Sequence, residues 1–241
     1  MSGSLRLDMG MFRAIFTIGV LAILPVAAVA QETPEEFWPE AQFYAQLSDR
    51  LRLRALVTRT KAKETGEFTE GSFEVDIDVG LKTILKRRLA PNPNAERGKY
   101  LTLRAGYIHV AALNDAENPS DEHRAIVELT PRYPLTGGFL LSDRGRVEAR
   151  WINGEYSLRF RNRLRLERDF AIGSFRFTPY ATGELFYDTR YQIWNRNEYS
   201  FGTEIPVRRH TIIEFYYIRQ NTSRSSTPHV NAFGLVFQWH L

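Results

Sequence analysis

The chain has 241 residues, no cysteine, and a formal net charge of +4 from 32 basic and 28 acidic residues. Without cysteine it can form neither a disulfide framework nor a lipid-modified N-terminus. The charges are too balanced to indicate a nucleic-acid partner. Arginine supplies 27 of the 32 basic residues, a bias that favours planar, bidentate pairing with carboxylates over simple solubilising charge.

The first thirty residues are typical of a cleavable secretory signal peptide. Two arginines precede a short apolar run, which ends in a small-x-small sequence with Ala28 and Ala30 at its two small positions. The run is shorter than the roughly 20 residues that a membrane-spanning helix needs. We therefore expect a signal peptide at 1–30, cleavage after Ala30, and a single exported domain at 31–241.

From about residue 41 onward, apolar and polar residues alternate in segments of about ten to fourteen residues, with no sustained helical period. Such spans suit tilted strands that cross a bilayer, whereas strands in soluble sandwiches average about five or six residues. Aromatic residues gather near the segment ends, as in the girdles of outer-membrane barrels. The clearest segments are 51–60, 73–82, 101–110, 124–133, 144–151, 156–167, 175–188, 199–205, 211–220 and 232–241, with a weaker one at 37–47.

These segments predict an all-β fold, a transmembrane antiparallel up-and-down β-barrel of about 10 to 12 strands. Because bacterial barrels have even strand numbers, ten or twelve is expected rather than eleven. The longer loops at 112–122 and 221–228 fit the outer side, and the shorter turns at 134–138 and 206–209 fit the periplasmic side. The stretch 83–99 is longer than a usual periplasmic turn, and the pattern does not explain it.

The last segment carries large apolar residues at every second position, so one face of the strand is apolar. These residues are Phe233, Leu235, Phe237, Trp239 and Leu241. The pattern resembles the closing strand that outer-membrane barrels present to their assembly machinery. We therefore expect a monomer in the outer membrane of a Gram-negative cell, exported through the periplasm, with lipid, lipopolysaccharide and the barrel-assembly machinery as partners.

Asn153-Gly154 lies between two alternating runs, which is the strongest short-range signal for a hairpin. The turn places Trp151 opposite Tyr156 on one face and Glu148 opposite Arg159 on the other, a cross-strand ion pair. Registers that pair charges across the neighbouring turns set Glu128 near Arg144, Arg124 near Glu148, Arg159 near Glu184 and Glu167 near Arg176. The resulting ion-pair lattice comprises Arg124, Glu128, Arg144, Arg146, Glu148, Arg150, Arg159, Arg161, Arg163, Arg165, Glu167, Arg176 and Glu184.

A second ladder is predicted between two strands nearer the N-terminus. One strand carries Arg50, Arg52 and Arg54, and the next carries Glu74, Asp76 and Asp78. If the apolar face meets lipid, all of these groups line the lumen, where charges must be paired or hydrated. The lattice then either fills a narrow barrel with satisfied side chains or leaves an excess of arginine along an anion-attracting path. A third interpretation is an inverted barrel with an apolar ligand cavity.

The arginine-rich strand carries a family resemblance. Its sequence runs from Arg159 through Asn162 and Arg163 to Glu167, after Arg146-Val-Glu148-Ala-Arg150 and before Pro179-Tyr180 and Glu184-Leu-Phe186. From near Trp38 to the C-terminus, the chain resembles an uncharacterised family of proteobacterial outer-membrane proteins, domain of unknown function 2490. The resemblance implies an outer-membrane barrel with an arginine and glutamate interior, and it implies no established activity.

No pattern of residues predicts an enzyme. The histidines are scattered at His109, His123, His210, His229 and His240, and none is spaced to set a nucleophile beside a base. No spacing indicates a metal site, and phosphate-binding glycine motifs are absent, so we expect no catalytic site, no metal and no cofactor. The sequence predicts an outer-membrane β-barrel of unknown specific activity, and one function consistent with its lumen is a narrow, anion-preferring, porin-like pore. The alternatives are a plugged structural barrel of the envelope and a lipid-modifying outer-membrane hydrolase.

Overall fold

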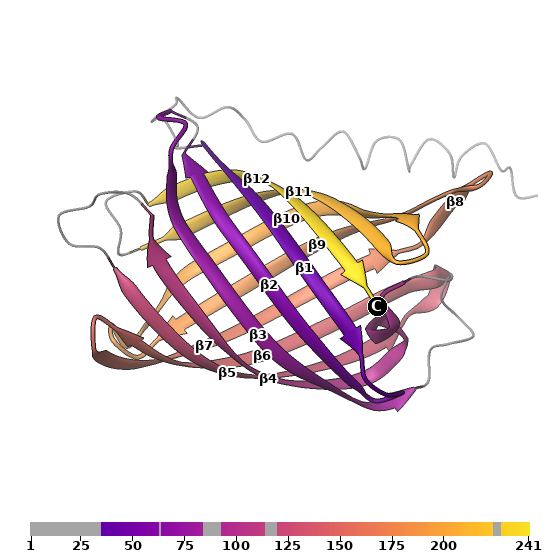
Figure 1. The fold of residues 1–241 in the computed structure, drawn as a ribbon, viewed down its shortest axis with the longest axis horizontal. Helices are drawn as coiled ribbons and strands as arrows, with labels where there is room; N and C mark the ends of the chain where they lie inside the picture. The colour runs from indigo at the N-terminus through magenta and orange to yellow at the C-terminus, as the bar shows by residue number, and fades with distance from the viewer. Residues whose placement is uncertain (1–34, 63, 84–92, 114–119, 224–227) are drawn as a thin grey trace, which may run out of the picture. The chain divides into compact units, whose positions relative to one another are not determined.

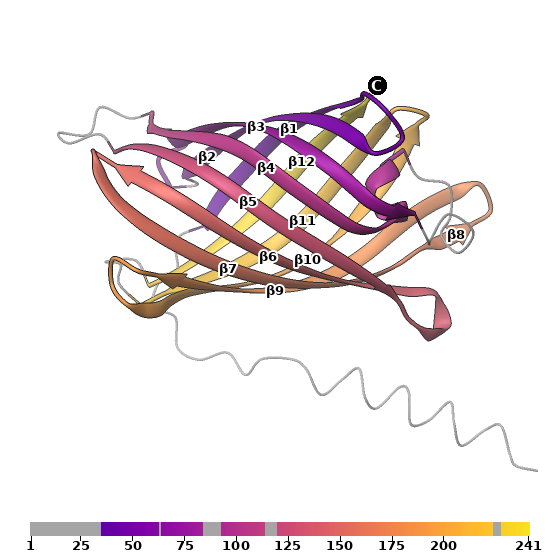
Figure 2. The same cartoon turned by 90° about the horizontal axis from the view of Figure 1, so that it is seen from below.

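The computed structural model describes residues 35–62, 64–83, 93–113, 120–223 and 228–241. The predicted signal peptide and its cleavage residues lie outside them. The described residues form one closed β-barrel of eleven strands plus a short twelfth strand, β8, outside the barrel wall (Figures 1 and 2). No helix among them is both long enough and apolar enough to span a membrane.

The barrel strands are long, and they correspond to the segments predicted from the alternation. They are β1 (Glu35–Gln46), β2 (Leu51–Ala62), β3 (Phe68–Thr83), β4 (Lys99–Ala112), β5 (Asp121–Pro134), β6 (Phe139–Ile152), β7 (Glu155–Arg168), β9 (Phe175–Asp188), β10 (Ile193–Arg208), β11 (Thr211–Thr222) and β12 (His229–His240). The short β8 (Phe170–Ile172) pairs only with the start of β9. Two 3₁₀ turns, η1 (Ala95–Gly98) and η2 (Thr136–Gly138), complete the described elements.

The barrel closes through a parallel pairing between its first and last strands. Trp38 lies opposite Gly234 and Tyr44 lies opposite His240, whereas the other neighbouring strands run antiparallel. The expectation of an even count was therefore wrong, although eleven lies within the predicted range of 10 to 12. With an odd number of alternating strands, the first and last run in the same direction, and their parallel ladder still removes both sheet edges. The weak segment at 37–47 is the strand that makes the count odd.

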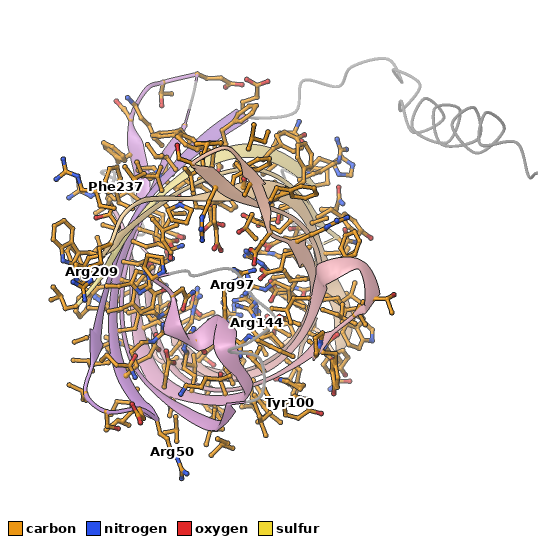
Figure 3. The ribbon with its side chains drawn as sticks, turned by 90° about the vertical axis from the view of Figure 1, so that its right-hand side faces the viewer. Arg50, Arg97, Tyr100, Arg144, Arg209 and Phe237 are labelled. Atoms are coloured by element: carbon orange, nitrogen blue, oxygen red, sulfur yellow. The ribbon has the colours of Figure 1, made fainter. Side chains whose placement is uncertain are left out.

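Along the strands, the polar residues are buried and the apolar residues are exposed, which is the reverse of a water-soluble protein. On β2, Arg52 is only 4% exposed, whereas the neighbouring Leu53 is 37% exposed. The outward set is aliphatic and aromatic, and it includes Phe43, Val57, Phe73, Ile77, Val127, Phe160, Phe215 and Phe237. Figure 3 looks along the barrel and shows Arg97 and Arg144 inside the ring of strands and Phe237 outside it. The inverted barrel is thus excluded, because the apolar face points outward.

The strand ends define two rims. The C-terminal rim holds the end of β12 with the turns around Asp49, Gly137 and Arg209, and there Gln46 donates its main-chain N–H to the carbonyl of Leu241 over 3.1 Å. The opposite rim holds the Asn153-Gly154 turn and the ends of β4 and β11. The loops predicted to be outer therefore share one rim, and the predicted periplasmic turns share the other. Aromatic pairs lie at both, with Trp151 and Tyr156 5.4 Å apart and Tyr100 and Tyr133 5.9 Å apart between ring centroids.

Two glycines make room for lumen side chains. A Cβ at Gly106 on β4 would collide with the carboxylate of Asp76 on β3, and a Cβ at Gly234 on β12 would collide with the ring of Tyr216 on β11. Each glycine faces its partner directly across the ladder. Glycine at these positions lets a large or charged inward side chain lie flat against the wall.

Candidate functional site in the barrel lumen

The hairpin of β6 and β7 has the register predicted from its Asn-Gly turn. Glu148 lies opposite Arg159 and Trp151 lies opposite Tyr156. Asn153 and Gly154 both have positive φ, 49° and 86°, as a type I′ turn requires. This register turns every second residue of both strands into the lumen and fixes the centre of the lattice.

The two neighbouring registers chosen to pair charges were wrong. Glu128 lies opposite Arg146 rather than Arg144, and Arg159 lies opposite Asp188 rather than Glu184. The shifts are two and four residues, both even, so the same side chains still face the lumen. The hairpins could not be placed from sequence because the turns at η2 and β8 lack the tight Asn-Gly geometry.

Arg176 does not belong to the lattice. It is exposed beyond the barrel wall, opposite Ala171 of β8. The partners of Glu167 are instead Arg97 and Arg165, each with a nitrogen 2.6 Å from a carboxylate oxygen. The prediction failed because the chain between Arg168 and Phe175 forms the β8 extension rather than a simple turn.

The most buried charge lies at the centre of the lattice. Glu148 has no exposed surface. Its carboxylate is 2.8 Å from Arg161, 3.7 Å from Arg146 and 3.9 Å from Arg159. A carboxylate in this position cannot remain ionised without such partners, because an isolated buried charge is very costly.

Each arginine around Glu148 also contacts a second carboxylate, so the lattice is continuous from β5 to β9. Arg161 binds Glu184 over 2.8 Å, Arg146 binds Glu128 over 2.8 Å, and Arg159 binds Asp188 over 3.1 Å. Other predicted members extend the lattice. Arg144 binds Glu184, and Arg165 binds Glu204. Arg124 and Arg150 both bind Glu122, and Arg150 also binds Asp188. Glu122, Asp188 and Glu204 were missed, although each occupies an inward position of its strand.

The second ladder forms between β2 and β3. Arg52 lies opposite Asp78 with 2.8 Å between nitrogen and oxygen, and Arg54 lies opposite Asp76 over 2.6 Å and also contacts Glu74. Arg50 does not take part, because it lies in the turn before β2 with its side chain exposed (Figure 3). Arg104 of β4, which was not among the predicted members, joins the ladder through Asp78 over 2.6 Å and lies 3.6 Å from Glu128.

The unexplained stretch between β3 and β4 places η1 in the lumen at the C-terminal rim. Glu96 contacts Arg52, Arg132 over 3.4 Å and Arg104 over 3.6 Å. On the other side of the turn, Arg97 contacts Glu167 over 2.6 Å and Asp169 over 2.9 Å. Burial raises the pKa of Glu96, but Arg52, Arg104 and Arg132 outweigh it and lower the pKa to about 2. Ion pairs of Glu96 and Arg97 thus hold the turn in place, and the turn narrows this end of the lumen.

Two cavities of about 430 Å³ each lie within the barrel. The first is lined by ten arginines and nine glutamates, the second by five arginines and four glutamates. Both include Glu40, Arg124, Arg161 and Glu198, so they adjoin along the barrel. The lumen is therefore charged throughout, with a small excess of arginine.

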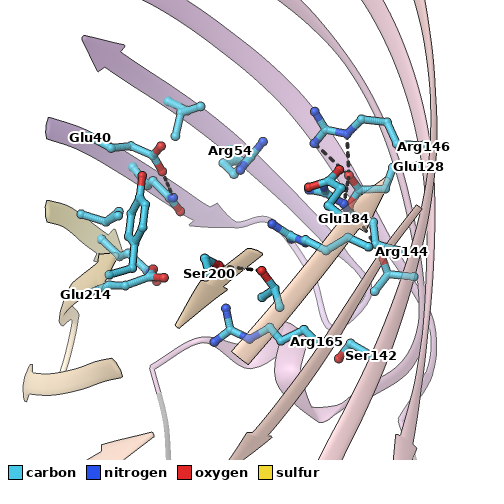
Figure 4. A pocket seen from close by; sticks show the side chains of 18 of the residues that line it. Glu40, Arg54, Glu128, Ser142, Arg144, Arg146, Arg165, Glu184, Ser200 and Glu214 are labelled. Atoms are coloured by element: carbon cyan, nitrogen blue, oxygen red, sulfur yellow. Dashed lines mark hydrogen bonds and ion pairs between the residues drawn. The ribbon is translucent and has the colours of Figure 1, made fainter. Parts of the chain in front are cut away.

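Acidic and basic side chains face one another across the first cavity, and both kinds occur on each wall (Figure 4). One wall carries Arg144 and Arg146 on β6 with Arg165 on β7, and Glu128 and Glu184 lie beside the two β6 arginines. The facing wall carries Glu40 on β1 and Glu214 on β11, with Arg54 on β2 near Glu40. Glu40 is hydrogen-bonded to Gln42, and Glu214 accepts hydrogen bonds from Tyr180 and Gln238. Neutral groups thus hold the carboxylates of this wall.

Arg163 lines the first cavity on β7. Within the part of the chain that the structure describes, its guanidinium makes no ion pair within 4.0 Å. Its neighbours Arg161 and Arg165 each bind two carboxylates. Glu184 and Glu128 act on its charge without direct contact, so its hydrogen-bond donors are available to an anion in the lumen.

The residues of the predicted assembly signal line the outside of β12. Phe233, Phe237, Trp239 and Leu241 are all exposed on the outer surface, and Leu235 is half-buried on the same face. They form part of the apolar exterior, as the alternation required.

An apolar exterior and a charged lumen define the class of protein, a β-barrel built to sit in a membrane. A family model described as a protein of unknown function, DUF2490, matches residues 82–231. The chain belongs to this family, as its arginine-rich strand indicated.

Three chains of known structure are similar to this chain, among them the following two. LpxR from Salmonella typhimurium is 11% identical, with a TM-score of 0.48, over 83% of this chain and 87% of that one. The β domain of the Bordetella autotransporter BrkA is 12% identical, with a TM-score of 0.47, over 86% of this chain and 97% of that one. No curated protein matches the sequence.

Proposed function

We propose that the protein is an outer-membrane barrel that acts as a narrow, anion-preferring pore, without enzymatic activity. The observation that carries the proposal is Arg163, a guanidinium that lines a charged cavity and has no carboxylate in direct contact among the described residues. Ion selectivity in pores follows from the charged side chains that line them. Arg163 supplies positive potential to the cavity from β7.

The preference for anions is expected to be modest. The cavity linings hold nearly equal numbers of arginines and glutamates, and most arginines are neutralised by the lattice. The conductance is expected to be small as well, because η1 occupies part of the C-terminal rim.

The test is a recording of ion current through the refolded barrel in a planar bilayer with a salt gradient. We expect a small conductance and a reversal potential of the sign that reports anion preference. Arg163→Gln should move the reversal potential toward that of an unselective pore. Arg50→Gln is the matched control, because Arg50 is an exposed arginine outside the lumen.

Two results would contradict the proposal. An absence of current in the wild-type barrel would favour a structural barrel whose lumen the lattice closes. Equal reversal potentials for wild type and Arg163→Gln would show that Arg163 is not the source of the selectivity.

The proposed location has separate support and a separate test. The exposed apolar residues of β12 fit a strand presented to barrel-assembly machinery, and the apolar exterior fits lipid. We expect the protein to fractionate with the outer membrane and to migrate differently on a detergent gel after heating. Recovery in the soluble periplasm would contradict this location.

A further inference from the structure

A cluster of two histidines and one aspartate lies on the outer surface of the barrel, away from the charged lumen. His109 on β4 lies directly opposite His123 on β5, with ring centroids 4.9 Å apart and ring planes 15° apart. The carboxylate of Asp121 reaches both rings. One of its oxygens is 2.7 Å from His109 Nε2 and the other is 3.3 Å from His123 Nε2.

The cluster is accessible from outside. The side chains of His109, His123 and Asp121 are 42%, 44% and 57% exposed. All three lie near the opposite rim, where β4 ends and β5 begins. Their outward direction follows from the alternation, since Tyr107 and Val127 on the same faces of the two strands are exposed as well.

Neighbouring groups hold two members of the cluster in place. The hydroxyl of Tyr107 is hydrogen-bonded to His123 Nδ1, which leaves Nε2 of that ring directed at Asp121. The main chain of Asp121 is tied to the β6–β7 turn by two hydrogen bonds of 2.9 Å, one to the side chain of Asn153 and one from its main-chain N–H. A partner on the second nitrogen of a histidine is what orients imidazole ligands in metal sites.

We propose that His109, Asp121 and His123 bind one divalent transition-metal ion of the zinc type. The three ligand atoms, one from each residue, lie within 4.8 Å of one another. Ligands about 2.0 to 2.2 Å from a tetrahedral zinc ion are about 3.3 Å apart, so small rotations of the side chains close the site. Two imidazoles and one carboxylate suit zinc, nickel or copper, whereas calcium and magnesium prefer oxygen ligands throughout.

Three protein ligands leave a coordination position open on the exposed side of the ion. Water or an anionic oxygen from the surroundings can fill it, as in zinc sites with three protein ligands. The ion would also join β4 and β5 to the β6–β7 turn through the two hydrogen bonds of Asp121. Metal binding is therefore expected to stabilise this rim, because a ligand that binds only the folded state raises its stability.

No metal site was expected from the sequence, because histidine spacing along the chain does not report which residues meet across two strands. Asp121 and His123 share one face of β5, and only the β4–β5 register brings His109 beside them. The Asp-x-His pattern on a strand was the one local signal, and it required a partner strand to complete it.

The experiment uses the refolded, untagged barrel in detergent after treatment with a chelator. Zn²⁺ is titrated by calorimetry, and Co²⁺ is added as a spectroscopic probe for its visible absorption. We expect one ion of either metal per chain and a cobalt spectrum typical of nitrogen and oxygen ligands. His109→Ala and His123→Ala should each weaken binding at least tenfold. Tyr107→Phe removes the hydroxyl that orients His123 and should weaken binding by no more than about 100-fold.

His229→Ala is the matched control, because His229 is an exposed histidine at the same rim and outside the cluster. It should bind both metals as the wild type does, and heat-modifiable migration checks that every variant is folded. The proposal is overturned if wild type and the folded His109→Ala/His123→Ala double variant bind Zn²⁺ equally. It is also overturned if His229→Ala loses binding to the same extent as the cluster variants.

Discussion

Replacing Glu148 by glutamine tests the ion-pair lattice at its most buried point. The substitution keeps the shape of the side chain and removes its charge. Glu148 is fully buried and lies 2.8 Å from Arg161, with Arg146 and Arg159 within 3.9 Å. Breaking a buried pair by removing one partner costs about 3 to 5 kcal/mol, because an uncompensated charge remains.

The expected cost for Glu148→Gln lies at the lower end of that range, about 3 kcal/mol. Each arginine around Glu148 keeps a second carboxylate, namely Glu184, Glu128 or Asp188. The lumen cavities also admit water, which hydrates part of the charge that is left. Glu148→Gln should therefore lower the free energy of unfolding by less than a substitution that leaves a buried arginine with no carboxylate partner.

The assay is reversible urea unfolding of the refolded barrel in lipid vesicles, followed by tryptophan fluorescence. Glu155→Gln is the matched control, since Glu155 belongs to the same hairpin and is exposed. The control should change the free energy of unfolding by less than about 0.5 kcal/mol. If Glu148→Gln and Glu155→Gln destabilise the barrel equally, Glu148 does not organise the lattice as described.

Further predictions concern the turn η1, the lumen residue Glu40 and the glycines of the barrel wall. Replacing Glu96 and Arg97 together by alanine should release η1 and raise the single-channel conductance; an unchanged conductance would show that η1 does not narrow the path. The pKa of Glu96 is lowered to about 2 from a usual value of 4.5. The contribution of its ion pairs to holding η1 in the lumen is therefore fully present above about pH 4.5. That contribution is lost as the pH falls through about 2, so conductance measured between pH 7 and pH 5 should show no opening from this group. Glu40→Gln should increase the anion preference, since it removes a carboxylate from the cavity wall whose hydrogen-bond partner is the neutral Gln42, and a reversal potential that moves the other way would show that Glu40 does not oppose anions in the lumen. Gly106→Ala should destabilise the barrel by about 1 to 3 kcal/mol, because its Cβ meets Asp76, whereas Gly145→Ala meets nothing within 4 Å and should be nearly neutral in the same unfolding assay.

The alternation of apolar and polar residues was sufficient to predict the barrel and the direction of its side chains. Strands β2, β6 and β7 show why, since Arg52, Glu148 and Arg163 alternate with outward apolar residues at a period that only a strand produces. The β6–β7 register was also predictable, because Asn153-Gly154 permits one tight turn. These features depend on neighbours in sequence.

Features that depend on distant strands were not predictable. The register between β7 and β9 depends on the β8 extension, which no turn motif marks, and Arg176 was misplaced for that reason. The closure of β1 on β12 depends on a parallel ladder between opposite ends of the chain. The contacts of Glu96 and Arg97 join η1 to four different strands and the β7–β8 connection, and no local pattern reports them.

The orientation of the two barrel faces is the claim on which the pore proposal rests, and two adjacent residues of β7 can test it. The chain has no cysteine, so Arg163→Cys and Leu164→Cys each give a single labelling position, one directed into the lumen and one exposed on the outside. The measurement is the quenching of a fluorophore at each position by brominated lipid in reconstituted vesicles. Strong quenching at position 164 with little at position 163 is the predicted result, and the reverse pattern would contradict the account.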